Sequence, residues 1–227
     1  MKIKLTVAIV AMLLAGHALS AQTARPPDLN GSWTPVRAAT AGGRRNTDFP
    51  SVDKIPFQAS ARAKYDASRP LGDIDAGCVP RGAVRYTTTA MLPFDIVQTP
   101  QKTVFLFNQH SAFRRIHTDG RKHPDGLQPT YFGHSIGRWE GSTFVVDTVG
   151  EKESTWLSVG EKGLPHSDAL HVTERIRLIE DGKYLEFEIT IDDPKSFSAP
   201  MKVTRYWERT LNVVDPEFVC EDALPID

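Results

Sequence analysis

The sequence predicts an all-β fold, an antiparallel up-and-down barrel of about eight or nine strands with one short N-terminal helix. Short runs alternate between apolar and polar residues, turn dipeptides separate neighbouring runs, and no long helical segments come between them. The chain of 227 residues suits a single domain, because barrels of this size commonly form one core.

The clearest pattern lies between Asp168 and Asp193, where two strand-like segments meet at Asp181-Gly182. If these two residues form the loop, one face of the hairpin is apolar apart from Glu174, and the other face pairs opposite charges. A shift of one residue would destroy both patterns, so the register is well specified. The predicted pairs are Leu178–Leu185, Ile176–Phe187, Glu174–Ile189 and Val172–Ile191 on the apolar face, and Arg177–Glu186, Arg175–Glu188 and His171–Asp192 on the other.

The remaining elements follow in order along the chain. The single helix is predicted at Pro56–Ser68, since Pro stands at its start and good helix formers follow. From Arg69 to Met91 no periodicity persists, and Gly and Pro residues indicate an ordered loop. The predicted strands outside the hairpin are Gly31–Val36, Phe94–Gln98, Lys102–Gln109, Ala112–Thr118, His134–Trp139, Thr143–Thr148 and Met201–Thr210.

Residues 1–20 are typical of a signal peptide, because Lys2 and Lys4 precede an apolar run from Leu5 to Ala15 and small residues follow. The run is too short for a membrane span, and we predict no other span. We therefore expect a periplasmic or secreted protein. Its single barrel domain is expected to occupy residues 21–227, with an irregular N-terminal part.

The charges indicate a small molecule as the partner. The 27 basic and 28 acidic residues are mixed along the chain and give a net charge of −1. This balance predicts no nucleic-acid binding, and no basic amphipathic helix is present that would bind a membrane surface. The two cysteines, Cys78 and Cys220, are expected to form a disulfide, because an exported protein enters an oxidising compartment.

Two resemblances carry further expectations. The run Asn30-Gly31-Ser32-Trp33 resembles the G-x-W signature of lipocalins and the wider calycin group, which implies a calycin-like barrel with Arg205 or Arg209 packed against Trp33. Three longer segments resemble an uncharacterised family of exported bacterial proteins, and this resemblance implies no activity. These segments are FRRIHTDGRKHP (113–124), GHSIGRWEGSTFVVDT (133–148) and PHSDALHVTER (165–175).

Histidines are the first candidate site residues, because His can act as acid or base near neutral pH. Five fall in predicted turns or at strand ends, where loops gather at a barrel mouth: His110, His117, His123, His134 and His166. Of these, His117, His134 and His166 are predicted to be catalytic, with scattered surface histidines as the alternative. A two-residue loop at Glu140-Gly141 would place Asp147 opposite His134, either orienting the imidazole or forming an ordinary cross-strand ion pair.

Glu174 is the fourth catalytic candidate, because a carboxylate on an apolar face is costly unless it is paired. Unpaired, it would be an acid or base in a cavity, and beside Arg205 or Arg209 it would form a structural pair. Arg114 and Arg115 are consecutive, so one of them points inward, where it could bind an anion or neutralise Glu174. The predicted ligand-binding residues are Arg114, Arg115, Asp147 and His171.

The sequence lacks the motifs of metal-binding sites and of nucleotide-binding loops. No H-x-x-x-H or H-E-x-x-H occurs, so no metal site is predicted, and no dinucleotide or phosphate-binding loop occurs, so no cofactor is expected. Two functions fit the sequence. The first is an exported small-molecule-binding barrel with cofactor-free acid/base catalysis of the lyase, isomerase or hydrolase type. The alternative is a non-catalytic periplasmic protein that holds an apolar ligand inside the barrel.

Overall fold

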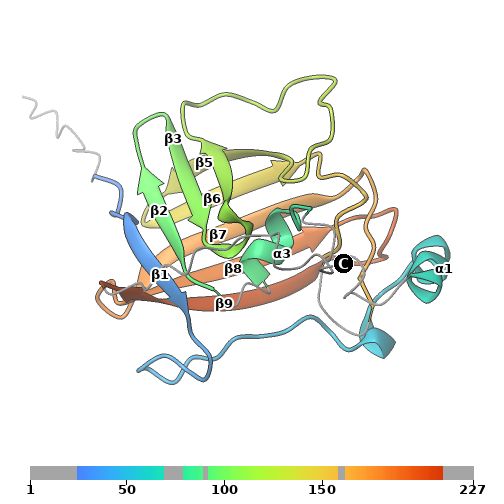
Figure 1. Ribbon diagram of the computed structural model, residues 1–227, viewed down its shortest axis with the longest axis horizontal. Coiled ribbons are helices and arrows are strands. Elements are labelled where there is room, and N and C mark those ends of the chain that lie inside the picture. Colours follow the sequence, from blue (N-terminus) through green and yellow to red (C-terminus); the bar gives the residue numbers. More distant parts are fainter. Residues whose placement is uncertain (1–24, 69–78, 89–91, 158–161, 212–227) are drawn as a thin grey trace, which may run out of the picture.

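The computed structural model describes residues 25–68, 79–88, 92–157 and 162–211. Nine strands form one closed barrel, in which each strand pairs with its neighbours in sequence and the last pairs with the first (Figure 1). The predicted all-β barrel is thereby confirmed. The strands are β1 (Gly31–Pro35), β2 (Phe94–Gln98), β3 (Lys102–Phe107), β4 (Ala112–His117), β5 (His134–Glu140), β6 (Thr143–Val149), β7 (His171–Ile179), β8 (Tyr184–Asp192) and β9 (Met201–Thr210).

The β7–β8 hairpin has the predicted register and faces. Ile176 lies opposite Phe187, and both side chains are fully buried inside the barrel. The turn is longer than the predicted two-residue loop, because residues 180–183 connect the last pair of the ladder, Ile179 with Tyr184. Within the turn, φ is positive at Glu180 (50°), Asp181 (55°) and Gly182 (81°). The alternation of apolar and polar residues therefore specifies the register of the ladder, whereas three residues of the turn adopt the left-handed conformation.

Ion pairing on the outer face of this hairpin follows the prediction only in part. Arg177 binds Glu186, as predicted. Arg175 lies opposite Glu188 in register, but its Nη1 contacts Glu140 Oε2 on β5 at 2.8 Å. The reason is that Arg175 also neighbours β6, and its long side chain reaches across that strand.

One helix was predicted, and the described residues contain two. Helix α1 (Ala59–Ala67) confirms the prediction, with Tyr65 buried and its ring 5.5 Å from that of Phe57. Helix α3 (Ala83–Thr88) falls in the stretch predicted to be irregular. All six of its residues are buried, so it has no amphipathic pattern for the sequence to reveal. The two 3₁₀ helices are η1 (Val52–Lys54) and η2 (Gln109–Ser111).

Strands β4 and β5 break the antiparallel order, which corrects the prediction of one antiparallel series. They run parallel and share only two residue pairs, Ile116 with Ser135 and His117 with Ile136. The connection over residues 118–133 returns the chain along the barrel, as a parallel pair requires. We call this short ladder and the residues flanking it the β4–β5 seam.

Large side chains fill the barrel interior. Phe94 packs edge-on against Trp207, with ring centroids 4.6 Å apart, and both are buried. Trp33 is fully buried, and the guanidinium of Arg209 lies 4.3 Å from its ring centroid. This is the Trp–Arg contact that the G-x-W resemblance implies, and the closed barrel is compatible with a calycin-like fold. Arg205 instead binds Asp48 and the backbone of Thr88.

Several predictions concern residues outside the described ranges. The proposed signal peptide at 1–20 and the proposed disulfide between Cys78 and Cys220 both lie there. Within the described part of the chain, no helix has the length and apolar character needed to cross a membrane.

Candidate functional site

A pocket of about 570 Å³ opens at the β4–β5 seam. Outward-facing side chains of β4 and the first residues of β5 form its walls, together with the loop residues that precede each strand. We call it the seam pocket. Its lining consists of Pro80, residues 110–113, Arg115, His117 and residues 130–135.

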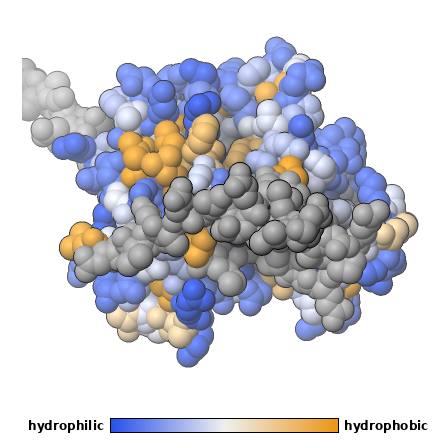
Figure 2. All heavy atoms as spheres, viewed as in Figure 1, coloured by the Kyte–Doolittle hydropathy of each residue, from blue (hydrophilic) through white to orange (hydrophobic). Residues whose placement is uncertain are grey.

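Aromatic side chains give the seam pocket an apolar wall. Phe113 is half exposed, and Figure 2 shows hydrophobic surface continuing from this region over β2–β4, where Val97 and Leu106 are also exposed. Phe132 is held from behind by Tyr86, with stacked rings 5.2 Å apart. The Arg115 guanidinium lies 4.8 Å from the Phe113 ring centroid, so the positive charge of this side chain lies next to the apolar wall.

Four histidines and one carboxylate gather beside the pocket on the outer face of the barrel. His134 Nδ1 is 2.8 Å from His123 Nδ1, and His123 Nε2 is 2.8 Å from Asp147 Oδ1. His171 Nε2 contacts the other oxygen, Asp147 Oδ2, at 2.8 Å. The ring of His117 stacks on that of His134 with centroids 5.3 Å apart. We call these five residues the histidine cluster.

The strands bring this cluster together in a way that differs from the predicted pairing. His134 lies opposite Val149, and Asp147 lies opposite Ile136, because the turn residues between β5 and β6 are Gly141 and Ser142. The register is therefore shifted by two residues, which leaves both side chains on the same face. His123, from the long connection after β4, bridges the gap between them.

The predicted partner of His171 is also corrected. His171 lies opposite Asp192 in the β7–β8 ladder, as expected. Its side chain, however, turns to the other neighbouring strand and binds Asp147 on β6. Asp147 thus receives hydrogen bonds from two imidazoles, which join β7 and the 118–133 connection to the same carboxylate.

Burial sets the protonation of the cluster. It lowers the pKa of His134 and His117, and nearby positive charge lowers both further. Burial disfavours ionisation of Asp147, but hydrogen bonds from His171 and His123 outweigh it, so that its pKa falls below the usual value. At neutral pH these effects favour an ionised Asp147 and neutral rings at His134 and His117.

The same strands carry a second polar cluster inside the barrel. Arg114 points inward and Arg115 outward, and both Arg114 and Glu174 have side chains only 1% exposed. Arg114 Nη1 donates to Glu174 Oε1 at 3.1 Å and Nη2 to Oε2 at 2.5 Å. Arg114 also binds Thr148 Oγ1 at 2.7 Å and Ser135 Oγ at 3.2 Å. Glu174 is therefore paired with Arg114, which confirms the expectation that one of Arg114 and Arg115 points inward and neutralises it. The other expected partners, Arg205 and Arg209, bind elsewhere.

His166 lies apart from the seam pocket lining. It is 1% exposed, and burial lowers its pKa. Its Nδ1 contacts the backbone oxygen of Ser167 at 2.9 Å, and its Nε2 contacts Thr155 Oγ1 at 2.8 Å. Both ring nitrogens are thus used in buried hydrogen bonds, which are typical of a structural histidine.

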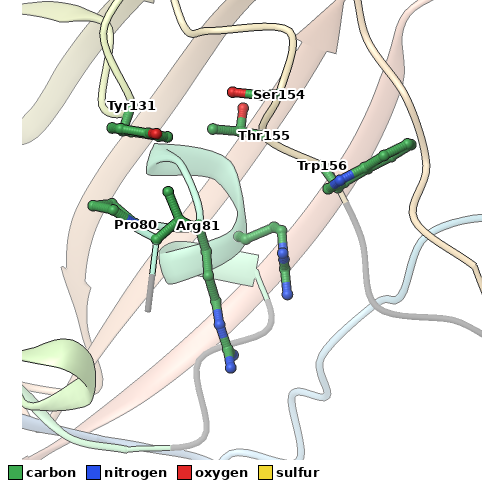
Figure 3. Close-up of a pocket in the computed structure, with 8 residues that line it drawn as sticks. Pro80, Arg81, Tyr131, Ser154, Thr155 and Trp156 are labelled. Carbon is green, nitrogen blue, oxygen red and sulfur yellow. The ribbon is translucent and has the colours of Figure 1, made fainter. Parts of the chain in front are cut away.

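A smaller pocket of about 150 Å³ adjoins the seam pocket and shares Pro80 and Tyr131 with it. Figure 3 shows its lining around the start of α3: Pro80 and Arg81 precede the helix, Tyr131 lies on one side, and Thr155 and Trp156 lie on the other. The two pockets are therefore neighbours between α3 and β4.

The structure brings together four of the predicted site residues, His117, His134, Asp147 and His171, and it places Arg115 in the pocket wall. It adds His110 and His123, which sequence analysis noted only as two of the histidines in turns. Their grouping at turns was the one available signal. Among the described residues, no group of three or more His, Cys, Asp or Glu side chains is arranged to hold a metal ion.

Comparison with models of known protein families gives no match, and comparison with curated proteins gives none either.

Proposed function

We propose that the seam pocket binds a small, partly apolar molecule and that His134 acts there as the general base of a cofactor-free acid/base reaction. The observation that carries this proposal is the chain of hydrogen bonds from His134 through His123 to Asp147, each 2.8 Å long. The N-terminal segment supports a periplasmic or secreted location for this activity.

The chain of hydrogen bonds defines where protons lie. An ionised carboxylate only accepts, so His123 donates to Asp147 through Nε2–H. A neutral His123 then has an unprotonated Nδ1, which accepts from Nδ1–H of His134. The remaining lone pair of His134 is on Nε2, and His134 lines the pocket. In the described part of the chain, this nitrogen has no hydrogen-bond partner.

This arrangement stabilises the charge that a base acquires. When His134 Nε2 takes a proton from the substrate, its Nδ1 proton can pass to His123, and the resulting imidazolium lies beside Asp147. The lowered pKa of His134 keeps the ring neutral, and hence able to accept a proton, at neutral pH. A carboxylate that orients and stabilises an imidazolium is the arrangement used by many general bases.

The pocket walls support a ligand with an apolar body. Phe113, Tyr131 and Phe132 offer aromatic surface, and Arg115 offers a positive charge beside it. The barrel interior is filled by side chains, so we place the ligand in the seam pocket and not inside the barrel. The same apolar wall favours the second candidate, a non-catalytic binding protein for an apolar ligand.

The two functions can be separated by incubating the protein with a metabolite extract and following all components by mass spectrometry. We expect wild type to consume a component that His134→Ala leaves intact, and Arg138→Ala, an exposed change on the same strand, to behave as wild type. If wild type consumes nothing but retains a component through gel filtration, the protein is a binding protein. Equal consumption by His134→Ala would exclude His134 as the base.

A further inference from the structure

Arg115 differs from the other arginines of the barrel strands in its partners. Its guanidinium lies over the Phe113 ring, 4.8 Å from the centroid, and its side chain makes no hydrogen bond or ion pair within the part of the chain that the structure describes. The remaining arginines on the strands each bind a carboxylate or backbone oxygens: Arg114, Arg138, Arg175, Arg177, Arg205 and Arg209.

The position of Arg115 in the sheet explains why it lacks a charged partner. It lies opposite Val104 on β3 and level with His134 on β5. Its neighbours along the outer face of β4 are Phe113 and His117. None of these four side chains is acidic, so neither adjacent strand offers a carboxylate for a cross-strand ion pair. The positive charge is therefore available to a ligand in the pocket that Arg115 lines.

The lining of the seam pocket favours one negative charge on that ligand. Arg115 is the lining residue with a permanent charge, and the lining contains no aspartate or glutamate. His134 and His117 are neutral at neutral pH, because burial lowers the pKa of both rings. A carboxylate carries a single charge, and its two oxygens match the planar guanidinium, whereas a phosphate monoester carries nearly two charges.

The pocket wall also fits the rest of such a ligand. The stacked contact with Phe113 places the Arg115 guanidinium beside the aromatic surface and leaves its N–H donors, which lie in the guanidinium plane, able to bind a second partner. Tyr131 and Phe132 continue the aromatic lining. A volume of about 570 Å³ is sufficient for a bicyclic aromatic acid.

We propose that Arg115 binds the carboxylate of the ligand and that the seam pocket selects small carboxylic acids with an aromatic or otherwise apolar body. Arg115 is then the residue that determines specificity, while proton transfer belongs to His134. For turnover, this proposal rests on the proposed function: the acid group held by Arg115 keeps the apolar body in the cavity that His134 also lines. Binding of the acid does not depend on catalysis.

The first test compares 2-naphthoate with its uncharged analogue 2-naphthamide, titrated into the full chain at low ionic strength. We expect wild type to bind naphthoate at least roughly tenfold more tightly, because a hydrogen bond to a charged group is worth more than one to a neutral group. Arg115→Gln should lose this preference and bind naphthamide as wild type does.

Arg138→Gln is the matched control, since Arg138 is an exposed arginine of β5 that is paired with Glu140. It should keep the preference for naphthoate. Equal binding of the two probes by wild type, no binding of either, or a preference for naphthoate that survives in Arg115→Gln would overturn the role of Arg115.

The second test divides the metabolite extract on an anion-exchange resin before incubation. We expect the component that wild type consumes or retains to be in the anionic fraction. For a consumed component, Arg115→Gln should raise KM at least roughly tenfold and change kcat less, because it removes a binding contact. A component found in the unbound fraction would overturn the proposal. If wild type binds naphthoate through Arg115 but consumes nothing, catalysis by His134 is wrong and the role of Arg115 stands.

Discussion

Strands β4–β7 carry two polar clusters on opposite faces of the same sheet, and the two differ in how completely their charges are neutralised. Inside, Arg114 and Glu174 form an ion pair with two hydrogen bonds and side chains 1% exposed, and the hydroxyls of Ser135 and Thr148 accept from two further donors of Arg114. Outside, Asp147 is 23% exposed and faces two imidazoles that can gain or lose a proton. The inner cluster therefore keeps one charge state, whereas the imidazoles of the outer cluster can gain or lose a proton.

Strand alternation explains how both clusters arise from adjacent residues. Ser135 and Thr148 point inward and bind Arg114, while their neighbours His134 and Asp147 point outward. A protein can therefore place a structural ion pair directly beneath a reactive site. The buried carboxylate of Glu174 is thus held in a structural ion pair, and the partly exposed carboxylate of Asp147 is the candidate for chemistry.

The largest expected effect is on the inner cluster. Glu174→Gln should lower the free energy of unfolding by about 3 to 5 kcal/mol, because it leaves the buried charge of Arg114 without its partner. Denaturant unfolding followed by circular dichroism measures this loss. The double variant Arg114→Met with Glu174→Leu is the control and should be more stable than Glu174→Gln, because no unpaired charge remains. A loss below about 1 kcal/mol for Glu174→Gln would remove the distinction between the two faces.

A second buried carboxylate, Glu151, gives a prediction about pH. Its Oε1 accepts from Ala83 N at 2.8 Å, its Oε2 has no partner among the described residues, and burial raises its pKa to about 8. The folded protein therefore holds this proton more tightly than the unfolded chain, whose Glu has an ordinary pKa near 4.5. The stability that this provides is fully present below that ordinary value and is lost as the pH rises through about 8.

Glu151→Gln should remove this dependence, because Gln carries no titrating proton. We expect the melting temperature of wild type to fall, relative to the variant, between about pH 5 and pH 9, with similar values at the acid end. Thermal unfolding at several pH values measures the difference. Parallel curves for the two proteins would show that Glu151 is ionised in the folded state.

The residues that face the barrel interior could be predicted from the sequence, whereas the contacts at the β4–β5 seam could not. Alternation placed Glu174 among Val172, Ile176 and their partners, because a period of two residues is visible within one strand. The sequence offered Arg114, Arg115, Arg205 and Arg209 as partners of Glu174 but did not choose among them, since Arg114 lies on a strand three positions away in the barrel. Only barrel closure brings the two side chains together.

The seam depends on contacts between segments that are distant in the sequence. His123 reaches His134 and Asp147 because residues 118–133 reverse the chain direction, and no local pattern gives the course of such a connection. Helix α3, which supplies Tyr86, was missed because its buried position, and not an amphipathic pattern, stabilises it. The histidines were recognised as candidates, but their hydrogen-bond order required the structure.

The smallest expected effect on stability, and the most informative for function, is that of Asp147→Asn on the outer face. The side chain is partly exposed, so loss of its charge should cost no more than about 1 kcal/mol of unfolding free energy. Its effect on protonation should be larger, because the carboxylate stabilises imidazolium at His123 and, through it, at His134. The pKa of His134 is already lowered by burial, and removing this negative charge should lower it further.

Titration of the histidine ring signals by NMR measures this change. In wild type, His134 should remain neutral down to a pH below the ordinary histidine value of 6.5, and in Asp147→Asn its midpoint should move to still lower pH. His166, buried and bonded to Thr155 and Ser167, is the internal control and should titrate alike in both proteins. If Asp147→Asn left the His134 midpoint unchanged but caused a large loss of stability, Asp147 would be a structural residue like Glu174. The proposed difference between the two faces would then be wrong.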